Sequence, residues 1–297
     1  MRKYLYLFLT ITIAASLLFF SFNSISFIES NNNDSVAVSK TTEVTVPILM
    51  FHHIQNSSGG TWTITGDNFR STLEFILEQG FTPISFNRLI GFVDGAADLP
   101  DKPVCINLDD GYYSNYEYVL PIVTELNVPI TVFMICDAIR SDDVIPVTDQ
   151  KELYMLSRLE LEFMEASPLI SIQNHSYGLH GVNMSYSLTE RDNCMPLDNE
   201  SEDDYKGMFN YDCEVSEQLL YSIGSEASMV FSYPCGKYNE WSEEVLKERG
   251  YRVSLTTDYG HRNLVVQGDS ETLFLLGRMN VNDDTSRKDL LKYLERK

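Results

Sequence analysis

The sequence predicts an α/β domain built as a distorted barrel of seven or eight β/α units. Three observations predict this fold class. Apolar runs of strand length alternate with amphipathic segments of helix length from residue 44 to the end of the chain. Such alternation is typical of a mainly parallel sheet with helices outside it, and the number of units favours a barrel. His52 and His53 follow the first strand, where an open doubly wound sheet would carry a glycine-rich turn.

Each expected element follows from its local pattern. The strands are short apolar runs that end at polar residues or glycine, and the helices repeat apolar residues every three or four positions. In chain order, we expect strands at 44–51, 81–85, 103–108, 129–135, 169–173, 229–233, 251–255 and 273–281. We expect helices at 67–80 (capped by Asp67), 87–93, 116–126, 156–165, around 215–220, and at 241–249 and 287–295.

The amino-terminal region differs from the rest of the chain. Residues 4–28 carry no charge and follow Arg2 and Lys3, and a run of about 20 apolar residues is enough to span a bilayer. The basic residues ahead of it favour a cytoplasmic amino terminus and an exported remainder. We therefore expect a signal-anchor or signal peptide at 1–28, a polar linker at 29–44 and one domain at 45–297. The domain would lie outside the cytoplasm, anchored in the cell membrane or secreted.

Composition narrows the partners. The formal net charge of −21 argues against nucleic acid or an anionic membrane surface. It suits either the solubility of an exported protein or a cationic polymer. The five cysteines match no zinc motif. Cys194 and Cys213 flank an acidic loop, so a disulfide between them is left open. We expect a monomer that contacts the membrane only through its amino-terminal segment.

Two adjacent carboxylates follow the apolar run 103–108. Asp109 and Asp110 precede Gly111, at the carboxyl end of an expected strand, where α/β barrels carry their chemistry. Neighbouring like charges raise each other's pKa, so an unpaired arrangement is unfavourable. A metal ion on one carboxylate, leaving the other free as a base, would relieve this conflict. An exposed Asp-Asp-Gly turn is the alternative on the triplet alone.

Histidines follow the ends of two other expected strands. His52 and His53 end the first strand, and His175 and His180 follow the strand at 169–173. Imidazoles five residues apart do not share a helix face, but Gly178 permits a turn that brings them together. Two histidines and one carboxylate leave an open position, which is the pattern of a catalytic metal. Zinc suits this set, and cobalt or nickel also accept it.

Three ordered segments carry a resemblance to a known family. They are Leu108-Asp109-Asp110-Gly111, the segment from His175 to His180, and Phe231-Ser232-Tyr233-Pro234-Cys235-Gly236. Together they resemble the motifs of the NodB-type polysaccharide deacetylases, carbohydrate esterase family 4. Segments 47–54 and 277–281 look like the branch that acts on poly-N-acetylglucosamine.

The resemblance spans residues 47–281 and implies a barrel of the NodB-homology type. It also implies a metal-dependent hydrolase that removes N-acetyl groups from N-acetylglucosamine units of a surface polysaccharide. The alternatives are a deacetylase of peptidoglycan or chitin oligomers, and a catalytically inactive polysaccharide-binding protein on the same fold. Retention of both aspartates and both histidines of the motifs opposes the inactive protein.

Residue by residue, the resemblance implies specific roles. Asp109 corresponds to the general base. His52 corresponds to the general acid, with His53 as the alternative. A backbone N–H near Cys235 would bind the oxyanion, while the aromatic rings of Tyr233 and Tyr238 are candidates to line the substrate cleft. The implied metal ligands are Asp110, His175 and His180.

One departure from the family pattern concerns the base. The family usually has an arginine where Ser232 stands, and that arginine steadies the catalytic aspartate. Arg278, at the end of the last expected strand, is a candidate replacement. A surface salt bridge is the alternative for this residue.

Overall fold

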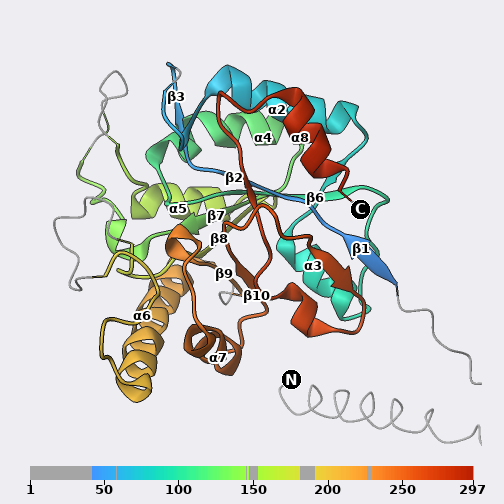
Figure 1. The fold of residues 1–297 in the computed structure, drawn as a ribbon. Helices are drawn as coiled ribbons and strands as arrows, with labels where there is room; N and C mark the ends of the chain where they lie inside the picture. The colour runs from blue at the N-terminus through green and yellow to red at the C-terminus, as the bar shows by residue number, and fades with distance from the viewer. Residues whose placement is uncertain are drawn as a thin grey trace, which may run out of the picture. The chain divides into compact units, whose positions relative to one another are not determined.

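A curled, mainly parallel sheet forms the centre of the structure, a computed structural model of the chain (Figure 1). Its strands are β2 (Ile48–Phe51), β5 (Thr82–Pro83), β6 (Pro103–Leu108), β7 (Ile130–Met134), β8 (Ile170–Asn174), β9 (Val230–Ser232), β10 (Val253–Leu255) and β12 (Met279–Asn280). They lie in the order β10, β9, β8, β7, β6, β2 and β12, with β5 beside β6, and neighbouring strands run parallel. The predicted α/β class with a parallel sheet is confirmed.

The structure describes residues 42–57, 59–144, 146, 153–180, 191–225 and 229–296. These residues belong to one unit that covers Thr41–Lys297. The expected membrane segment at 1–28, and the linker up to residue 41, lie outside the described residues. Within the described part of the chain, no helix has the length and apolar character needed to cross a membrane.

The two ends of the strand order meet at one point. Leu255, the last residue of β10, forms an isolated parallel bridge with Leu276, just before β12. The N–H of Leu276 donates to the carbonyl of Ser254 at 2.9 Å, and its own carbonyl accepts from Thr256 at 2.8 Å. The sheet therefore curls far enough for its edges to touch through a single bridge.

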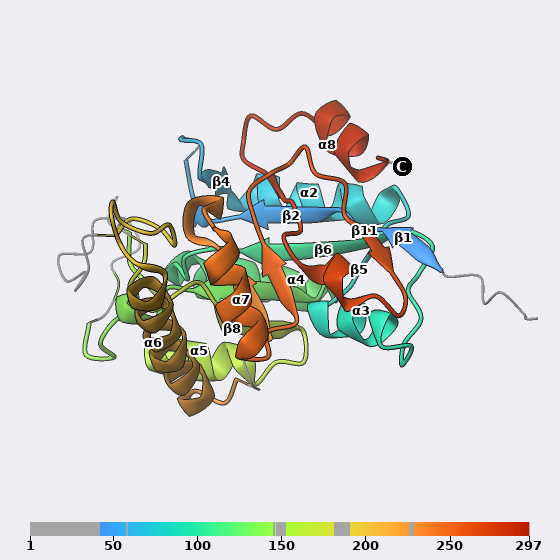
Figure 2. The same ribbon diagram turned by 60° about the horizontal axis from the view of Figure 1, so that its bottom comes forward.

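Helices pack outside this sheet and follow the strands in alternation. They are α2 (Gly66–Glu78), α3 (Phe86–Val93), α4 (Leu120–Leu126), α5 (Arg158–Glu165), α6 (Glu202–Ser222), α7 (Glu240–Glu248) and α8 (Arg287–Leu294). Short helical turns are η1 (Asn115–Val119), η2 (Cys136–Ala138), η3 (Pro234–Gly236) and η4 (Ser270–Leu273). The early helix α2 and the last helix α8 lie side by side (Figures 1 and 2), and Arg287 donates to the Thr72 hydroxyl at 3.0 Å.

Several boundaries differ from those expected. The strand expected at 44–51 is split into β1 (Glu43–Thr45) and β2, and Pro47, which lacks a backbone donor, lies in the break. β1 pairs antiparallel with β11 (Leu264–Val266), which the sequence did not predict. The prediction of Asp67 as the cap of α2 is wrong, because the Thr65 hydroxyl accepts from the N–H of Asn68 at 3.3 Å.

One other expectation changes, and one further strand pair was not expected. Only Met279–Asn280 of the strand expected at 273–281 pairs as a strand. β3 (His53–Gln55) and β4 (Thr63–Thr65) form a separate parallel pair beside the first strand.

The strands bury alternate residues in two different apolar clusters. Leu49, Ile106 and Leu108 face the cluster that packs under α2, α4, α5 and α8. Ile48 and Cys105 face the other cluster, which includes residues of β9 and β10. Because side chains alternate along a strand, the positions that follow Cys105 at intervals of two face the inside of the curled sheet.

The disulfide left open by the sequence is not found. Cys194 and Cys213 both lie as free, buried thiols in a third apolar cluster, which packs under α6 and α7.

Candidate active site

A sharp turn after β6 presents the two neighbouring aspartates. The N–H of Asp109 still donates to the carbonyl of Phe51 at 2.9 Å, so its position is fixed by the sheet. Asp110 has φ 73° and Gly111 has φ 82°, both in the left-handed region. A Cβ on Gly111 would lie 2.1 Å from the sulfur of Met134, so another residue at this left-handed position would displace that side chain. The left-handed conformation of Asp110 is the kind of backbone strain that is concentrated at functional sites.

A second left-handed turn follows β8 and carries the histidine segment. The N–H of His175 donates to the carbonyl of Met134 at 3.0 Å, and Ser176 has φ 71°. The imidazole Nδ1 of His175 lies 2.7 Å from the carbonyl oxygen of Ser232. A carbonyl oxygen only accepts hydrogen bonds, so Nδ1 must carry the proton. In the neutral form of this ring, the lone pair is therefore on Nε2.

Asp110, His175 and His180 converge on one point. The Oδ1 atom of Asp110 lies 3.5 Å from Nε2 of His175 and 3.6 Å from Nε2 of His180. One ligand atom from each residue lies within 4.8 Å of the others. Within the described residues, this buried Oδ1 has no hydrogen-bond partner. A buried carboxylate oxygen without a donor, facing two imidazole nitrogens, fits a divalent metal ion.

The protonation states of the cluster suit metal binding. Burial disfavours the charged carboxylate of Asp110, but the neighbouring imidazoles of His175 and His52 outweigh it and lower the pKa. Burial, together with the neighbouring His175, lowers the pKa of His180 to about 4. At neutral pH, this gives a carboxylate and a neutral imidazole, the forms in which both residues bind metals.

Asp109 is held by a different set of contacts. Nη1 and Nη2 of Arg278 lie 2.7 and 2.8 Å from its two carboxylate oxygens, and the side chain of Arg278 is fully buried. Nε of Arg278 donates to the carbonyl of Thr256 at 2.9 Å. The alternative of a surface salt bridge for Arg278 is therefore wrong.

Two shorter polar side chains complete the surroundings of Asp109. The amide of Asn107 donates to Oδ1 at 3.1 Å, and the Ser232 hydroxyl donates to Oδ2 at 3.3 Å. Ser232, at the position where the resembling family has arginine, thus still contacts the aspartate. Burial opposes the charge of Asp109, but Arg278 and His175 outweigh it and lower the pKa. The carboxylate is consequently ionised at neutral pH.

His52 and His53 have different surroundings. The charges of Asp110 and Asp109 both act on His52, although burial is the larger effect and lowers its pKa. Its Nδ1 is buried and has no hydrogen-bond partner in the described part of the chain. His53, in contrast, has its Nδ1 3.0 Å from the Ser114 hydroxyl. The charges of the aspartate pair thus act on His52, whereas the side chain of His53 contacts Ser114.

The predicted cleft residues separate into three cases. Tyr233 is wrong as a cleft residue, because it is fully buried and its hydroxyl donates to Glu243 at 2.7 Å. Tyr238 is 39 % exposed and packs on Tyr233 with 5.6 Å between ring centroids. Cys235 is exposed and has φ 54°. Burial and the charge of Asp110 raise the pKa of its thiol.

Three residues of the site were not predicted from the sequence. The buried Asp212 of α6 accepts from the N–H groups of Tyr177 and Gly178, both at 2.9 Å, and so fixes the turn between the two histidines. Asp212 lies on the buried stripe of α6, and a charged residue on such a stripe was an available signal. Asn107, a polar residue inside an apolar strand, was another. Trp62, 52 % exposed with its ring centroid 4.7 Å from that of His52, gave no signal.

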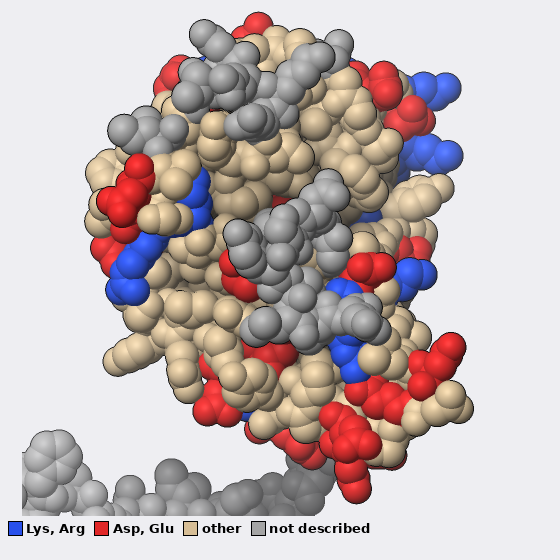
Figure 3. Space-filling view, turned by 90° about the vertical axis from the view of Figure 1, so that its left-hand side faces the viewer, with Lys and Arg blue, Asp and Glu red and all other residues tan. Residues whose placement is uncertain are grey.

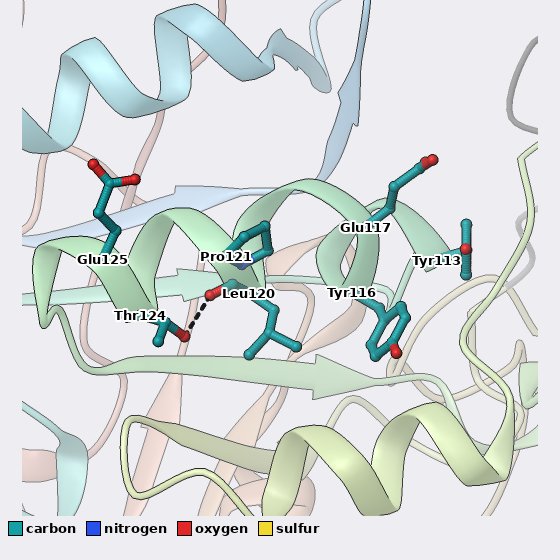
Figure 4. Close-up of a pocket in the computed structure, with 7 residues that line it drawn as sticks. All are labelled: Tyr113, Tyr116, Glu117, Leu120, Pro121, Thr124 and Glu125. Atoms are coloured by element: carbon teal, nitrogen blue, oxygen red, sulfur yellow. Dashed lines mark hydrogen bonds between the residues drawn. The ribbon is translucent and has the colours of Figure 1, made fainter.

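One surface hollow lies apart from these residues. It has a volume of about 670 Å³ and runs along η1 and α4 (Figure 4). Tyr113 and Tyr116 lie at one end and Glu125 at the other, while the Thr124 hydroxyl donates to the carbonyl of Leu120. None of the predicted site residues lines this hollow.

Comparison with known proteins indicates the family. The family model described as "Polysaccharide deacetylase" matches residues 96–254. The Bacillus subtilis (strain 168) protein YxkH is 23% identical over 269 residues, which is 90% of this chain and 83% of YxkH. The poly-beta-1,6-N-acetyl-D-glucosamine N-deacetylase of Staphylococcus epidermidis is 22% identical over 198 residues, 66% of this chain and 61% of that enzyme.

Solved structures share the fold. A de-N-acetylase from Aggregatibacter actinomycetemcomitans superimposes with a TM-score of 0.70 at 20% identity, covering 84% of this chain and 100% of that one. IcaB from Ammonifex degensii gives a TM-score of 0.65 at 19% identity, covering 85% and 100%.

Proposed function

Because this chain belongs to the polysaccharide deacetylase family, we propose that it is a metal-dependent hydrolase acting on N-acetylglucosamine units of a surface polysaccharide. It would remove the N-acetyl groups and leave the sugar chain intact. The resemblance to poly-β-1,6-N-acetyl-D-glucosamine N-deacetylases supports this substrate.

The observation that carries the proposal is the division of the aspartate pair. Asp110 faces two imidazole nitrogens through an oxygen without a donor, while both oxygens of Asp109 are held by Arg278. The two carboxylates are adjacent in sequence but differ in surroundings, which is how one site assigns two roles. In our proposal, Asp110, His175 and His180 hold the metal ion, and Asp109 is the general base.

The metal ion would be zinc, with cobalt or nickel as alternatives for such a ligand set. When bound, it would polarise the acetamide carbonyl and lower the pKa of the attacking water. Asp109 would then accept a proton from that water. Its lowered pKa keeps it ionised, and Arg278 fixes its orientation.

His52 is our proposed general acid. Burial lowers the pKa of His52, and the negative charges of Asp110 and Asp109 oppose this effect by favouring the protonated form. The imidazolium would donate a proton to the leaving amine nitrogen as the C–N bond breaks. A proton taken up at Asp109 and one delivered by His52 leave the site balanced for the next turnover once they exchange with water.

The backbone N–H of Cys235 is the proposed donor to the oxyanion. Cys235 follows Pro234 in the η3 turn, and its left-handed φ of 54° gives this turn its shape. A backbone donor held by a rigid turn needs no reorganisation when negative charge develops on the carbonyl oxygen.

The charge of the chain is consistent with a polysaccharide substrate. Acidic side chains gather toward the lower part of the face seen in Figure 3, and the chain carries a net charge of −21. Such a surface repels nucleic acid and would attract the cationic, deacetylated product. We propose an extracytoplasmic location with membrane attachment through residues 1–28, on the basis of the uncharged run in that segment.

The test of this function is acetate release from three polymers: poly-N-acetylglucosamine, chitin oligomers and peptidoglycan. We expect release to be fastest from poly-N-acetylglucosamine, lost with a chelator and restored by zinc. Faster release from peptidoglycan or chitin would assign the enzyme to that substrate instead. Binding of the polymers without any acetate release would indicate an inactive binding protein, and release that survives chelation would contradict the metal mechanism.

A further inference from the structure

The side chain of Trp62 packs on His52, the proposed general acid. Their ring centroids lie 4.7 Å apart with an interplanar angle of 57°, although Trp62 is 52 % exposed. A ring that is half exposed gains only part of the free energy of burial, so its position depends on how the backbone beside it is held.

The backbone beside Trp62 is held by two distant parts of the chain. The carbonyl of Trp62 accepts from the N–H of His53 at 3.2 Å. The carbonyl of Thr61 accepts from the side-chain amides of Asn280 and Asn282, at 2.8 and 3.0 Å. We call these two amide contacts the asparagine clamp. The clamp ties the turn before β4 to residues 219 and 221 positions further along the chain, at the end of β12 and just beyond it.

The β12 segment also carries the residue that holds the proposed base. Arg278 immediately precedes β12 and pairs with Asp109. Because side chains alternate along a strand, Arg278 and Asn280 lie on one side of this segment. Met279 lies on the other side, where it packs on the apolar cluster under α2, α4, α5 and α8. One short segment therefore contacts both the proposed base and the turn beside the proposed acid.

The imidazole of His52 lacks the hydrogen bond that often orients a catalytic histidine. Such a ring is commonly held through one nitrogen by a carboxylate or a carbonyl, which sets the direction of the other nitrogen. Nδ1 of His52 is buried and has no hydrogen-bond partner among the residues that the structure describes. The amide of Asn115 donates to the backbone carbonyl of His52 at 3.1 Å, but this contact does not restrain the ring. Packing of the Trp62 indole against the imidazole can supply the missing restraint.

We propose that Trp62 is a positioning residue for His52, and that the asparagine clamp keeps the indole in place. The inference rests on the proposed function, because it gives Trp62 a part in proton delivery to the leaving amine. Through Arg278 and the clamp, the β12 segment would fix the proposed base and the proposed acid together. A misplacement of about 1 Å can cost about 100-fold in rate, so a loosened indole should have a measurable effect.

The test compares two substrates that differ in their leaving group. The amine of a glucosamine unit must be protonated as the C–N bond breaks, whereas p-nitrophenolate leaves as a stable anion when the C–O bond of p-nitrophenyl acetate breaks. The ester therefore reports on folding and on the rest of the site, but not on the general acid. In Trp62→Ala, we expect kcat for poly-N-acetylglucosamine to fall about 10–100-fold, with little change for the ester. Trp62→Phe keeps an aromatic ring against His52 and should recover most of the lost rate.

The asparagine clamp is tested without altering Trp62. Asn280→Ala combined with Asn282→Ala removes both amide donors to Thr61. This double variant should lower kcat for the polysaccharide and leave kcat for the ester close to the wild-type value. Asn210→Ala, on the exposed face of α6, is the control and should match the wild-type protein on both substrates.

Three results would overturn the proposal. Equal losses on the polysaccharide and the ester in Trp62→Ala would mean that the change disturbs the whole site. A raised KM with unchanged kcat would mean that Trp62 binds the sugar and does not orient His52. An unchanged kcat for the polysaccharide in the double asparagine variant would refute the clamp.

Failure of the proposed function would look different, because the wild-type protein would then release no acetate from the polysaccharide. The part of Trp62 in proton delivery would fall with that function, and fluorescence would decide on the clamp alone. The chain has two tryptophans, so Trp62 is the remaining one in Trp241→Phe. In that protein, the two asparagine changes should lower the fluorescence anisotropy of Trp62, since a freed turn moves within nanoseconds. Unchanged anisotropy would overturn the clamp.

Discussion

Arg278 donates hydrogen bonds to both carboxylate oxygens of Asp109 in a buried ion pair, with N–O distances of 2.7 and 2.8 Å. The two residues are 169 positions apart: Asp109 follows β6 and Arg278 precedes β12, with β2 between these strands in the sheet. Removing one member of a buried pair leaves an uncompensated charge, which costs about 3–5 kcal/mol. The pair therefore explains both why Asp109 stays ionised in a buried place and why its orientation is fixed.

Arg278→Lys tests the consequence for catalysis. Lysine keeps the charge but cannot hold both oxygens, so the pKa of Asp109 should rise from its lowered value. A base works above its pKa, so the acidic limb of the kcat/KM profile should move to higher pH, and kcat should fall about 100-fold. Arg252→Lys, at an exposed pair with Asp94, is the control and should leave the profile unchanged. If the acidic limb of the kcat/KM profile stays in place in Arg278→Lys, then Arg278 does not set the protonation state of Asp109.

His52→Gln and His53→Gln separate the two neighbouring histidines. The charges of both aspartates act on His52, whereas His53 is bonded to Ser114. Loss of a general acid typically costs about 10²–10⁴-fold in rate, so we expect that loss in His52→Gln. In His53→Gln, kcat should fall less than about tenfold, because this change removes only the contact with Ser114. The reverse order in measured kcat would assign the acid to His53.

Asp212→Asn tests the turn between the two proposed histidine ligands. The carboxylate accepts from two backbone N–H groups, and an amide can accept only one of these bonds through its oxygen. Mutation of a residue that orients metal ligands typically weakens metal affinity about 10–100-fold, so we expect Asp212→Asn to lose metal affinity in that range. Cobalt titration followed by visible absorption measures it directly. Glu214→Gln, on the exposed face of the same helix, is the matched control, and equal affinities in the two variants would contradict this role for Asp212.

Asp212→Asn should also change how the free energy of unfolding depends on pH. Burial raises the pKa of Asp212 to about 6, so the folded state holds this proton more tightly than the unfolded chain. Stability from that proton is fully present below about pH 4 and is lost as pH rises through about 6. The amide side chain of the variant has no such proton. Urea unfolding should show Asp212→Asn gaining roughly 1–3 kcal/mol relative to the wild-type protein between pH 4 and 7. A constant difference across this range would contradict the raised pKa.

The order of strands and helices could be predicted because buried parallel strands read as continuous apolar runs, such as Pro103–Leu108. The pairs β1–β11 and β3–β4 could not. Each is a short ribbon of three residues per strand, and such segments show no clear periodicity. Pro47 can interrupt a strand because it lacks a backbone N–H. The sequence does not show that the segments on its two sides pair with different strands, β11 and β6.

The part of the candidate site that lies in short local motifs could be predicted from the sequence. Asp110, His175 and His180 lie at strand ends that a parallel sheet brings to one edge, and the structure brings their ligand atoms together. The choice of Arg278 as the partner of Asp109 was open, because the sequence does not say which distant side chain reaches it. Tyr233 was mistaken for a cleft residue, since an aromatic residue beside a motif gives no sign of its burial.

The central claim is that Asp109 and Asp110 have different roles, and it is tested most directly by metal content and acetate release measured on the same samples of two variants. Asp109→Asn should bind zinc with wild-type stoichiometry and release no acetate from poly-N-acetylglucosamine. Asp110→Asn should lose the zinc, and its activity with it. The account would be contradicted by an Asp109→Asn enzyme that turns over at the wild-type rate, or by an Asp110→Asn protein that retains zinc at full stoichiometry.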